Sequence, residues 1–254
     1  MKHLLLFLAL FLPGLSQAQD VSDLDFDETK VFAEQGDANS QYMLGVMYAQ
    51  GIDVPQNAAE AVKWWIQAAE QGHASSQYNL GTAYQRGVGV PQDDAESVKW
   101  FHKAAQQGNV KAQFNIGLAY HQGVVVLQND VEAVMWWRLA AEQGNVLSQH
   151  NLGMAHFQGA GVPQDYSEAA KWWRLAAEQG HAAAQHLLAS AYFLGKGVPQ
   201  DYIESYMWEY LAASSGFPGA IELLDVTAKT LSRKDRNAAK KKADELLKEI
   251  RQRQ

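Results

Sequence analysis

The pattern of apolar and polar positions in this chain recurs as a block of 36 residues. In one block, Ser76, Leu80, Ala83 and Tyr84 fall at i, i+4, i+7 and i+8, and this spacing predicts a helix with one buried face. A glycine-rich loop follows, and a second helical pattern begins after Asp93. Each block therefore predicts two helices joined by a short loop.

Glutamine and glycine residues at fixed spacing define five such blocks, which follow one another without insertion or deletion. The pattern predicts repeats at 37–72, 73–108, 109–144, 145–180 and 181–216, with half-units at 24–36 and 217–231. The expected fold is an all-α solenoid over residues 19–231. We expect residues 232–254 to form a basic capping helix, because the end of a solenoid exposes an apolar face that needs a cover.

The second helix of each block carries two adjacent aromatic positions, which hold all eight tryptophans of the chain. One helix cannot bury that much aromatic surface alone, so we interpret the tryptophans as the core between stacked units; a ligand-binding aromatic box is the alternative. An Asn or Asp precedes each second helix, and a Glu follows three residues later, as in Asp93 and Glu96. This pattern predicts an acidic form of the capping box, with each cap contributing about 1 kcal/mol.

The fourth block shows the complete pattern of a known repeat family. Its four segments are Gln149-x-x-Leu152-Gly153, Gly159-Ala160-Gly161-Val162-Pro163-Gln164-Asp165, Ala169-x-x-Trp172-Trp173 and Ala176-Ala177-Glu178-Gln179-Gly180. The chain resembles the Sel1-like repeat family, a relative of tetratricopeptide repeats. The resemblance implies an α/α superhelix that holds partners, often in envelope or host-contact roles in bacteria, and it implies no particular reaction or ligand.

The N-terminus has the pattern of an export signal. Lys2 and His3 give a basic start, residues 4–12 form an apolar run, and the segment ending at Ala18 fits a small-residue cleavage site. We predict a signal peptide at residues 1–18 and a periplasmic or secreted mature chain that starts near Gln19. A buried N-terminal helix is the alternative interpretation.

Charge and composition narrow the classes of partner. Residues 229–254 hold ten Lys or Arg and four Asp or Glu, whereas residues 19–228 hold ten basic and 24 acidic residues. An acidic body argues against nucleic acid as a partner. The chain contains no Cys, so its stability depends on packing. No apolar stretch of the expected mature chain is long enough for an integral membrane segment.

The sequence offers no set of residues for catalysis. Ser97-Val98-Lys99 and Lys229-Thr230-Leu231 both miss the motifs of class A β-lactamases. His150 and His186 lie one repeat apart, or about 10 Å between packed helices, which is too far for both to bind one zinc ion. We therefore predict a protein that is not an enzyme and that binds no cofactor or metal. An envelope enzyme or a peptidoglycan-binding protein is the alternative from another class.

The face of the first helix opposite its buried stripe varies between repeats, and it carries a ladder of rings beside a ladder of side-chain amides. Rings can pack against the side chains of an extended peptide, and amides can bond its backbone. We predict that a protein or peptide binds the concave surface lined by the first helices; the alternative is that the rings stack on one another between units. The candidate residues are Tyr42, Tyr78, Asn79, Phe114, Asn115, His121, His150, Asn151, Phe157, His186 and Phe193.

The loop of the third repeat departs from the others. It reads Val124-Val125-Val126-Leu127 where the other loops mostly have a second Gly and all have a Pro. Neutral drift and an apolar contact patch both account for this change, and the sequence leaves the two open.

Overall fold

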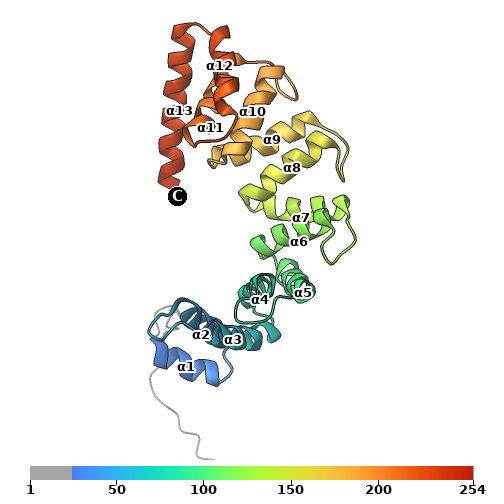
Figure 1. The fold of residues 1–254 in the computed structure, drawn as a ribbon, viewed down its shortest axis with the longest axis vertical. Coiled ribbons are helices and arrows are strands. Elements are labelled where there is room, and N and C mark those ends of the chain that lie inside the picture. The colour runs from blue at the N-terminus through green and yellow to red at the C-terminus, as the bar shows by residue number, and fades with distance from the viewer. Residues whose placement is uncertain (1–24, 254) are drawn as a thin grey trace, which may run out of the picture.

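The computed structural model describes residues 25–253, so the predicted signal peptide lies outside the described part. Within that part the chain forms thirteen α-helices and no strand (Figure 1). The helices are α1 (Phe26–Glu34), α2 (Ala38–Gln50), α3 (Ala58–Glu70), α4 (Ala74–Arg86), α5 (Asp94–Gln106), α6 (Val110–Gln122), α7 (Asp130–Glu142), α8 (Val146–Gln158), α9 (Tyr166–Glu178), α10 (Ala182–Leu194), α11 (Tyr202–Ser214), α12 (Ala220–Thr230) and α13 (Arg233–Arg253).

Each helix packs mainly against its neighbours in the chain, so the structure is a solenoid. The pairs α2/α3, α4/α5, α6/α7, α8/α9 and α10/α11 form the five repeats, and each second helix also packs against the first helix of the next repeat. The resulting row of helix pairs winds as a superhelix (Figure 1). The predicted all-α solenoid of five helix pairs is confirmed. Helix α1 packs on α2, α12 packs on α11, and α13 lies against the far side of α11.

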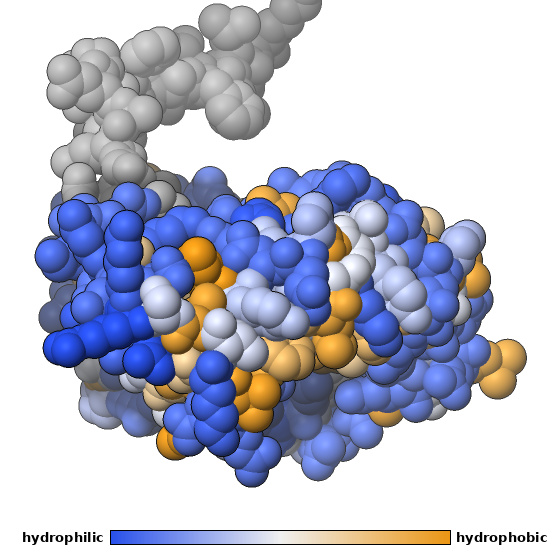
Figure 2. Space-filling view, turned by 90° about the horizontal axis from the view of Figure 1, so that it is seen from above, coloured by the Kyte–Doolittle hydropathy of each residue, from blue (hydrophilic) through white to orange (hydrophobic). Residues whose placement is uncertain are grey.

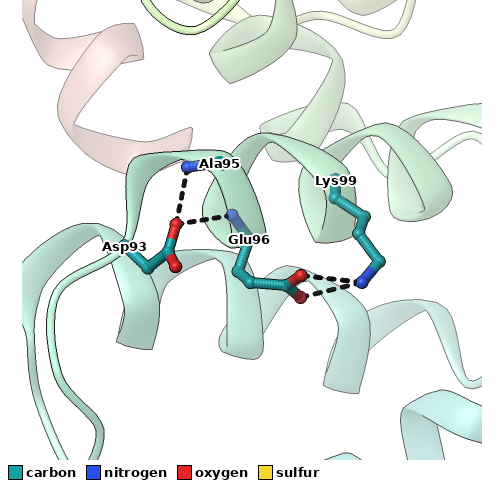
Figure 3. Close-up of polar contacts among 4 residues, drawn as sticks. All are labelled: Asp93, Ala95, Glu96 and Lys99. Carbon is teal, nitrogen blue, oxygen red and sulfur yellow. Dashed lines mark hydrogen bonds and ion pairs between the residues drawn. The ribbon is translucent and has the colours of Figure 1, made fainter.

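The ends of the repeated helices follow the predicted signals, with one difference. Every first helix of a repeat ends at a glycine in the left-handed conformation, such as Gly87 with φ 66°. Asp93 accepts hydrogen bonds from the backbone N–H groups of Ala95 and Glu96 (Figure 3). The Glu96 carboxylate does not return to the cap but pairs with Lys99, while the Asp93 N–H donates to the carbonyl of Tyr84 in the preceding helix. The prediction of a capping box is therefore wrong in one of its two hydrogen bonds, the one from the N–H of Asp93 to the Glu96 carboxylate.

The tryptophans mostly form the core, as expected. Trp100, Trp136, Trp137, Trp173 and Trp208 are at least nine-tenths buried, whereas the other three are half-buried. A glycine in the first helix makes room for the second aromatic position: a Cβ added to Gly117 would lie 2.4 Å from the ring of Trp137. No side chain fits at that distance, so this contact requires glycine.

Buried glutamines connect each repeat to the one before it. The Gln113 amide nitrogen donates to the Ala105 carbonyl of the preceding repeat at 3.3 Å, and its amide oxygen accepts from Gln143 at 2.9 Å. The same relay occurs at Gln41, Gln77 and Gln149. In the fifth repeat, Ser215 takes the place of the donor glutamine, and the Gln185 amide oxygen has no partner among the described residues.

We expect Gln113→Met to lower the free energy of unfolding by about 1–3 kcal/mol, because methionine fills the same space but makes neither of the two hydrogen bonds, each worth about 0.5–1.5 kcal/mol. Denaturant unfolding of the purified chain measures this change. The matched control is Gln185→Met, which removes only one of the two hydrogen bonds and should cost less. Equal losses in the two variants would show that packing, not the relay, is what the glutamine contributes.

The third loop adopts the same conformation as its counterparts at a steric cost. Val125 has φ 66° where the equivalent Gly89, Gly161 and Gly197 have φ between 71° and 77°. A β-branched residue is unfavourable in the left-handed region, by roughly 1–2 kcal/mol. The loop thus retains the backbone path of the repeat with a residue that this path disfavours.

Candidate functional site

Four cavities lie at equivalent places in successive repeats. Each is enclosed by the end of the first helix and one side of the second helix of one repeat, and by the middle of the first helix of the next repeat. In chain order their volumes are about 190, 80, 220 and 80 Å³. The cavities therefore form a row along successive first helices, at the spacing of the repeat.

The third cavity, the largest of these four, shows how the repeat builds this arrangement. Helix α6 contributes His121, α7 contributes Asp130 and Trp137, and α8 contributes Asn151 and Met154. The second aromatic position of the second helix lines every cavity, and it is held in place by the glycine contact described above. The four rings are Trp65, Phe101, Trp137 and Trp173.

Three of the four cavities carry an asparagine at the same repeat position. Asn79, Asn115 and Asn151 line the first, second and third cavities, and Leu187 takes this place in the fourth. The asparagines are half-buried, and their side-chain amides make no hydrogen bond to any described residue. A half-buried amide has donors and an acceptor to offer, so each of these cavities presents a free polar group beside an aromatic ring.

The chemistry of the third cavity favours binding over catalysis. His121 Nδ1 lies 2.8 Å from Asp130 Oδ1, and the His121 ring packs 5.3 Å from the Trp137 ring, centroid to centroid. None of the lining residues is a Ser, Thr, Cys or Lys that this pair could activate. Across residues 25–253, no group of three or more His, Cys, Asp or Glu side chains is placed to hold a metal ion.

The structure divides the predicted site residues into two sets. One set lines the row of cavities, and the other set does not. The lining set is Asn79, Asn115, His121, Asn151 and Phe157. The second set, which is half-buried and lines none of the four, is Tyr42, Tyr78, Phe114, His150, His186 and Phe193.

The rings of the second set pack against neighbouring helices. Three of them stack on the residue that starts the next repeat or half-unit, with centroid distances of 4.7 Å for Tyr42–His73, 4.8 Å for His150–His181 and 5.2 Å for His186–Phe217. Tyr78 packs on Phe101, Phe193 on Tyr202, and Phe114 on the core cluster around Leu152. Ring stacking between units, the alternative left open by the sequence, thus describes part of this set.

His186 also contacts a group that the other repeats lack. In the fifth repeat Glu209 stands at the second aromatic position, and Ala189 replaces the glycine that faces the ring. The Glu209 carboxylate is fully buried and lies 2.7 Å from His186 Nδ1. Burial raises the pKa of Glu209, while the hydrogen bond to Glu209 raises the pKa of His186.

The lining rings are the residues that the sequence analysis did not place in a site. The repeat pattern places Trp65, Phe101, Trp137 and Trp173 in the core, which is correct for most of their surface, but each ring also lines a cavity. The signal in the sequence was the glycine twenty residues before each ring. That pairing marks a close contact between the first and second helices and hence the wall of the cavity.

His150 is held in its neutral form by its surroundings. Burial, and then the nearby His181, lower the pKa of His150 from 6.5 to about 4. The pKa values of His73, His156 and His181 are also lowered, with burial as the largest cause in each. A histidine with a depressed pKa in the folded state favours unfolding in acid, because the unfolded chain binds a proton that the folded chain does not.

We expect the free energy of unfolding to fall as the pH drops from about 6.5 to about 4, and His150→Phe to make this fall shallower by up to one proton in the linkage slope. Phenylalanine is a suitable replacement because Phe114 occupies the equivalent position of the third repeat. Denaturant unfolding at a series of pH values measures the slope. Identical slopes for the two proteins would show that folded His150 binds its proton normally.

The fold and the repeated cavities define the class of this protein as a helical-repeat scaffold with a row of small cavities. The Sel1 repeat profile matches residues 38–73, 74–109, 110–145, 146–181 and 182–217, one residue later than the predicted boundaries. The chain belongs to the Sel1 repeat family. Sel1 repeat proteins generally act as scaffolds for protein–protein interaction, and their fold is typically non-enzymatic.

Solved structures show the same fold. A protective antigen present in uropathogenic Escherichia coli strains is 41% identical, with a TM-score of 0.73 over 76% of this chain and 42% of that one. A Sel1 repeat protein from Oxalobacter formigenes is 34% identical, with a TM-score of 0.71 over 82% of this chain and 89% of that one. The chain thus spans less than half of the first protein and most of the second. It has no match among curated proteins. None of the helices in residues 25–253 has the length and hydrophobicity that crossing a membrane requires.

Proposed function

We propose that this chain is an exported scaffold that binds an extended segment of a partner protein along the row of cavities. The segment lies across successive first helices, and its side chains enter the hollows in turn. Its backbone meets the asparagine amides. The site residues are those of the predicted set that line the cavities, and the stacked rings of the second set hold the first helices in position.

The free asparagine amides carry this proposal. These amides are partly exposed and make no hydrogen bond within the described residues, so their donors and acceptor are available to a ligand. The same chain uses its other repeated amides, such as Gln77 and Gln113, completely. Amides that recur at one position in three repeats, each beside an aromatic ring, fit an extended peptide whose backbone groups recur along its length.

Export is supported by the N-terminal pattern and by the nature of one relative. Residues 1–18 combine a basic start, an apolar run and a small-residue end. The E. coli protein that is 41% identical to this chain is a protective antigen, a description that is compatible with an exported protein. Both observations favour a periplasmic or secreted chain.

For export, we expect the mature protein from its native host to begin at Gln19, because cleavage after Ala18 follows the small-residue pattern. Intact-mass measurement on the protein purified from each cell fraction identifies the first residue. A soluble cytoplasmic chain that keeps Met1 would contradict the proposal.

For binding, we expect Asn115→Ala to weaken a peptide ligand by about 1–3 kcal/mol, because a ligand backbone group loses its partner in a desolvated site. Ligands come from selection of a library of unstructured peptides on the full chain, followed by titration calorimetry. The stability of the chain should hardly change, since this amide bonds nothing in the free protein.

The matched control is Gln106→Ala, which truncates an exposed amide on α5 that lines none of the four cavities. Affinity should be unchanged in this variant. If Asn115→Ala and Asn151→Ala both retain full affinity for every selected peptide, the ligand does not lie along the row of cavities.

A further inference from the structure

Helix α7 exposes a stripe of apolar side chains that nothing within residues 25–253 covers. Val131, Met135 and Leu139 occur at i, i+4 and i+8, so they lie on one face of the helix. They are 63%, 46% and 41% exposed, and Leu127, in the loop before the helix, is 91% exposed. Seen from the end that carries α12 and α13, the surface of the molecule is largely hydrophilic, with patches of apolar residues (Figure 2).

The other repeats show that the apolar residue at the position of Met135 is not part of the repeat pattern, although Leu175 of the fourth repeat is exposed like its counterpart Leu139. Three repeats have a lysine where Met135 stands, and each lysine pairs with the glutamate three residues earlier. The pairs are Lys63–Glu60 at 2.5 Å, Lys99–Glu96 at 2.8 Å and Lys171–Glu168 at 2.5 Å. The lysine and its ion pair make this face of the second helix polar in those repeats.

The fifth repeat also has a methionine at this position, and there the structure shows the reason. Met207 and Leu211, the counterparts of Met135 and Leu139, are 1% exposed and belong to one buried cluster with Ala239 and Ala243 of α13. Glu204, which lacks a lysine on its own helix, pairs instead with Lys242 of α13. In the fifth repeat, therefore, an amphipathic helix covers the apolar face and provides the missing cation.

The third repeat has the counterparts of Met207, Leu211 and Glu204, but no helix in the described part of the chain covers them. Its apolar face is exposed, and the Glu132 carboxylate, the counterpart of Glu204, has no ion-pair partner within residues 25–253. We propose that α7 is a docking site for a basic amphipathic helix of a partner protein, which lies on α7 as α13 lies on α11. The partner helix presents small and branched apolar residues to Met135 and Leu139, and a lysine to Glu132.

Charge and area favour this occupant over a second copy of the chain. Three side chains on one helix are too few to bury the roughly 1,200 Å² that a stable interface between folded proteins needs, whereas a single helix can lie along such a stripe. The body of this chain is strongly acidic and would repel its own copy, but it would attract a basic helix. The chain's own basic helix is already held on α11.

A labelled peptide with the sequence of residues 232–254 is a suitable probe, because it has the required chemistry and its way of docking on α11 is known. We expect it to bind the full chain in a fluorescence-anisotropy titration, and Met135→Lys to weaken that binding about tenfold or more. Met135→Lys should fold normally, because lysine is the residue of three other repeats. The matched control is Gln67→Lys, which adds the same charge on the second helix of the first repeat and should leave the affinity unchanged.

A mutant cycle tests the register. Glu132→Gln in the chain and Lys242→Ala in the peptide should each weaken binding, and the two together should weaken it little more than either alone, because both remove one ion pair. The wild-type interaction should also weaken at high salt.

Three outcomes would overturn the proposal. The peptide could fail to bind at concentrations up to about 1 mM, which would mean a dissociation constant too high for a specific contact. It could bind wild type and Met135→Lys equally, and would then occupy another place, such as α11 after exchange with the resident helix. Light scattering could show a dimer that Met135→Lys dissociates, in which case a second copy covers the stripe.

Discussion

The buried glutamine that begins each repeat is the contact on which the rest of the solenoid depends. Its amide must reach a carbonyl of the preceding repeat and, at the same time, the glutamine that ends its own repeat. The bond to the carbonyl is buried and the bond from the second glutamine is partly buried, and each contributes about 0.5–1.5 kcal/mol. These two hydrogen bonds fix the position of each helix pair relative to the one before it. The glycine that contacts an aromatic ring sets the distance between the two helices of a pair. With both contacts fixed, every other repeat position recurs in an equivalent place.

The fifth repeat shows what happens where this constraint ends. No further complete repeat follows it, and the donor glutamine becomes Ser215, so the Gln185 oxygen loses its partner. The aromatic ring and the glycine beneath it are replaced together, by Glu209 and Ala189. A buried carboxylate is tolerated there because His186 bonds to it, and an ion pair of this kind specifies geometry more than it adds stability. The end of the solenoid is then covered by α12 and α13.

Repeat periodicity made the helices, their caps and the solenoid predictable, because each signal occurs five times and depends only on residues near it in sequence. The candidate site was only partly predictable. A helical pattern tells which face of its own helix Tyr78 or Asn79 occupies, but not what the next repeat places there. The rings at one position turned out to meet neighbouring helices, while the amides one residue later line cavities. The missing hydrogen bond of the capping box also depends on a contact that the pattern of one helix does not show. The N–H of Asp93 donates to the carbonyl of Tyr84 in the preceding helix.

Differences between repeats carry information that a single domain cannot provide, because the other repeats act as internal controls at every position. Lys63, Lys99 and Lys171 show what the fold requires of the outer face of a second helix, which is only that it be polar. Met207 shows what that face becomes when a helix must lie on it. Met135 makes the outer face of α7 apolar, as Met207 does on α11, although no helix among the described residues covers α7. In the loop before α7, Val125 keeps a backbone conformation that glycine would adopt without strain. Neither change improves the folded chain itself. Contact with the helix proposed to dock on α7 would account for both changes, and neutral drift would account for the loop as well.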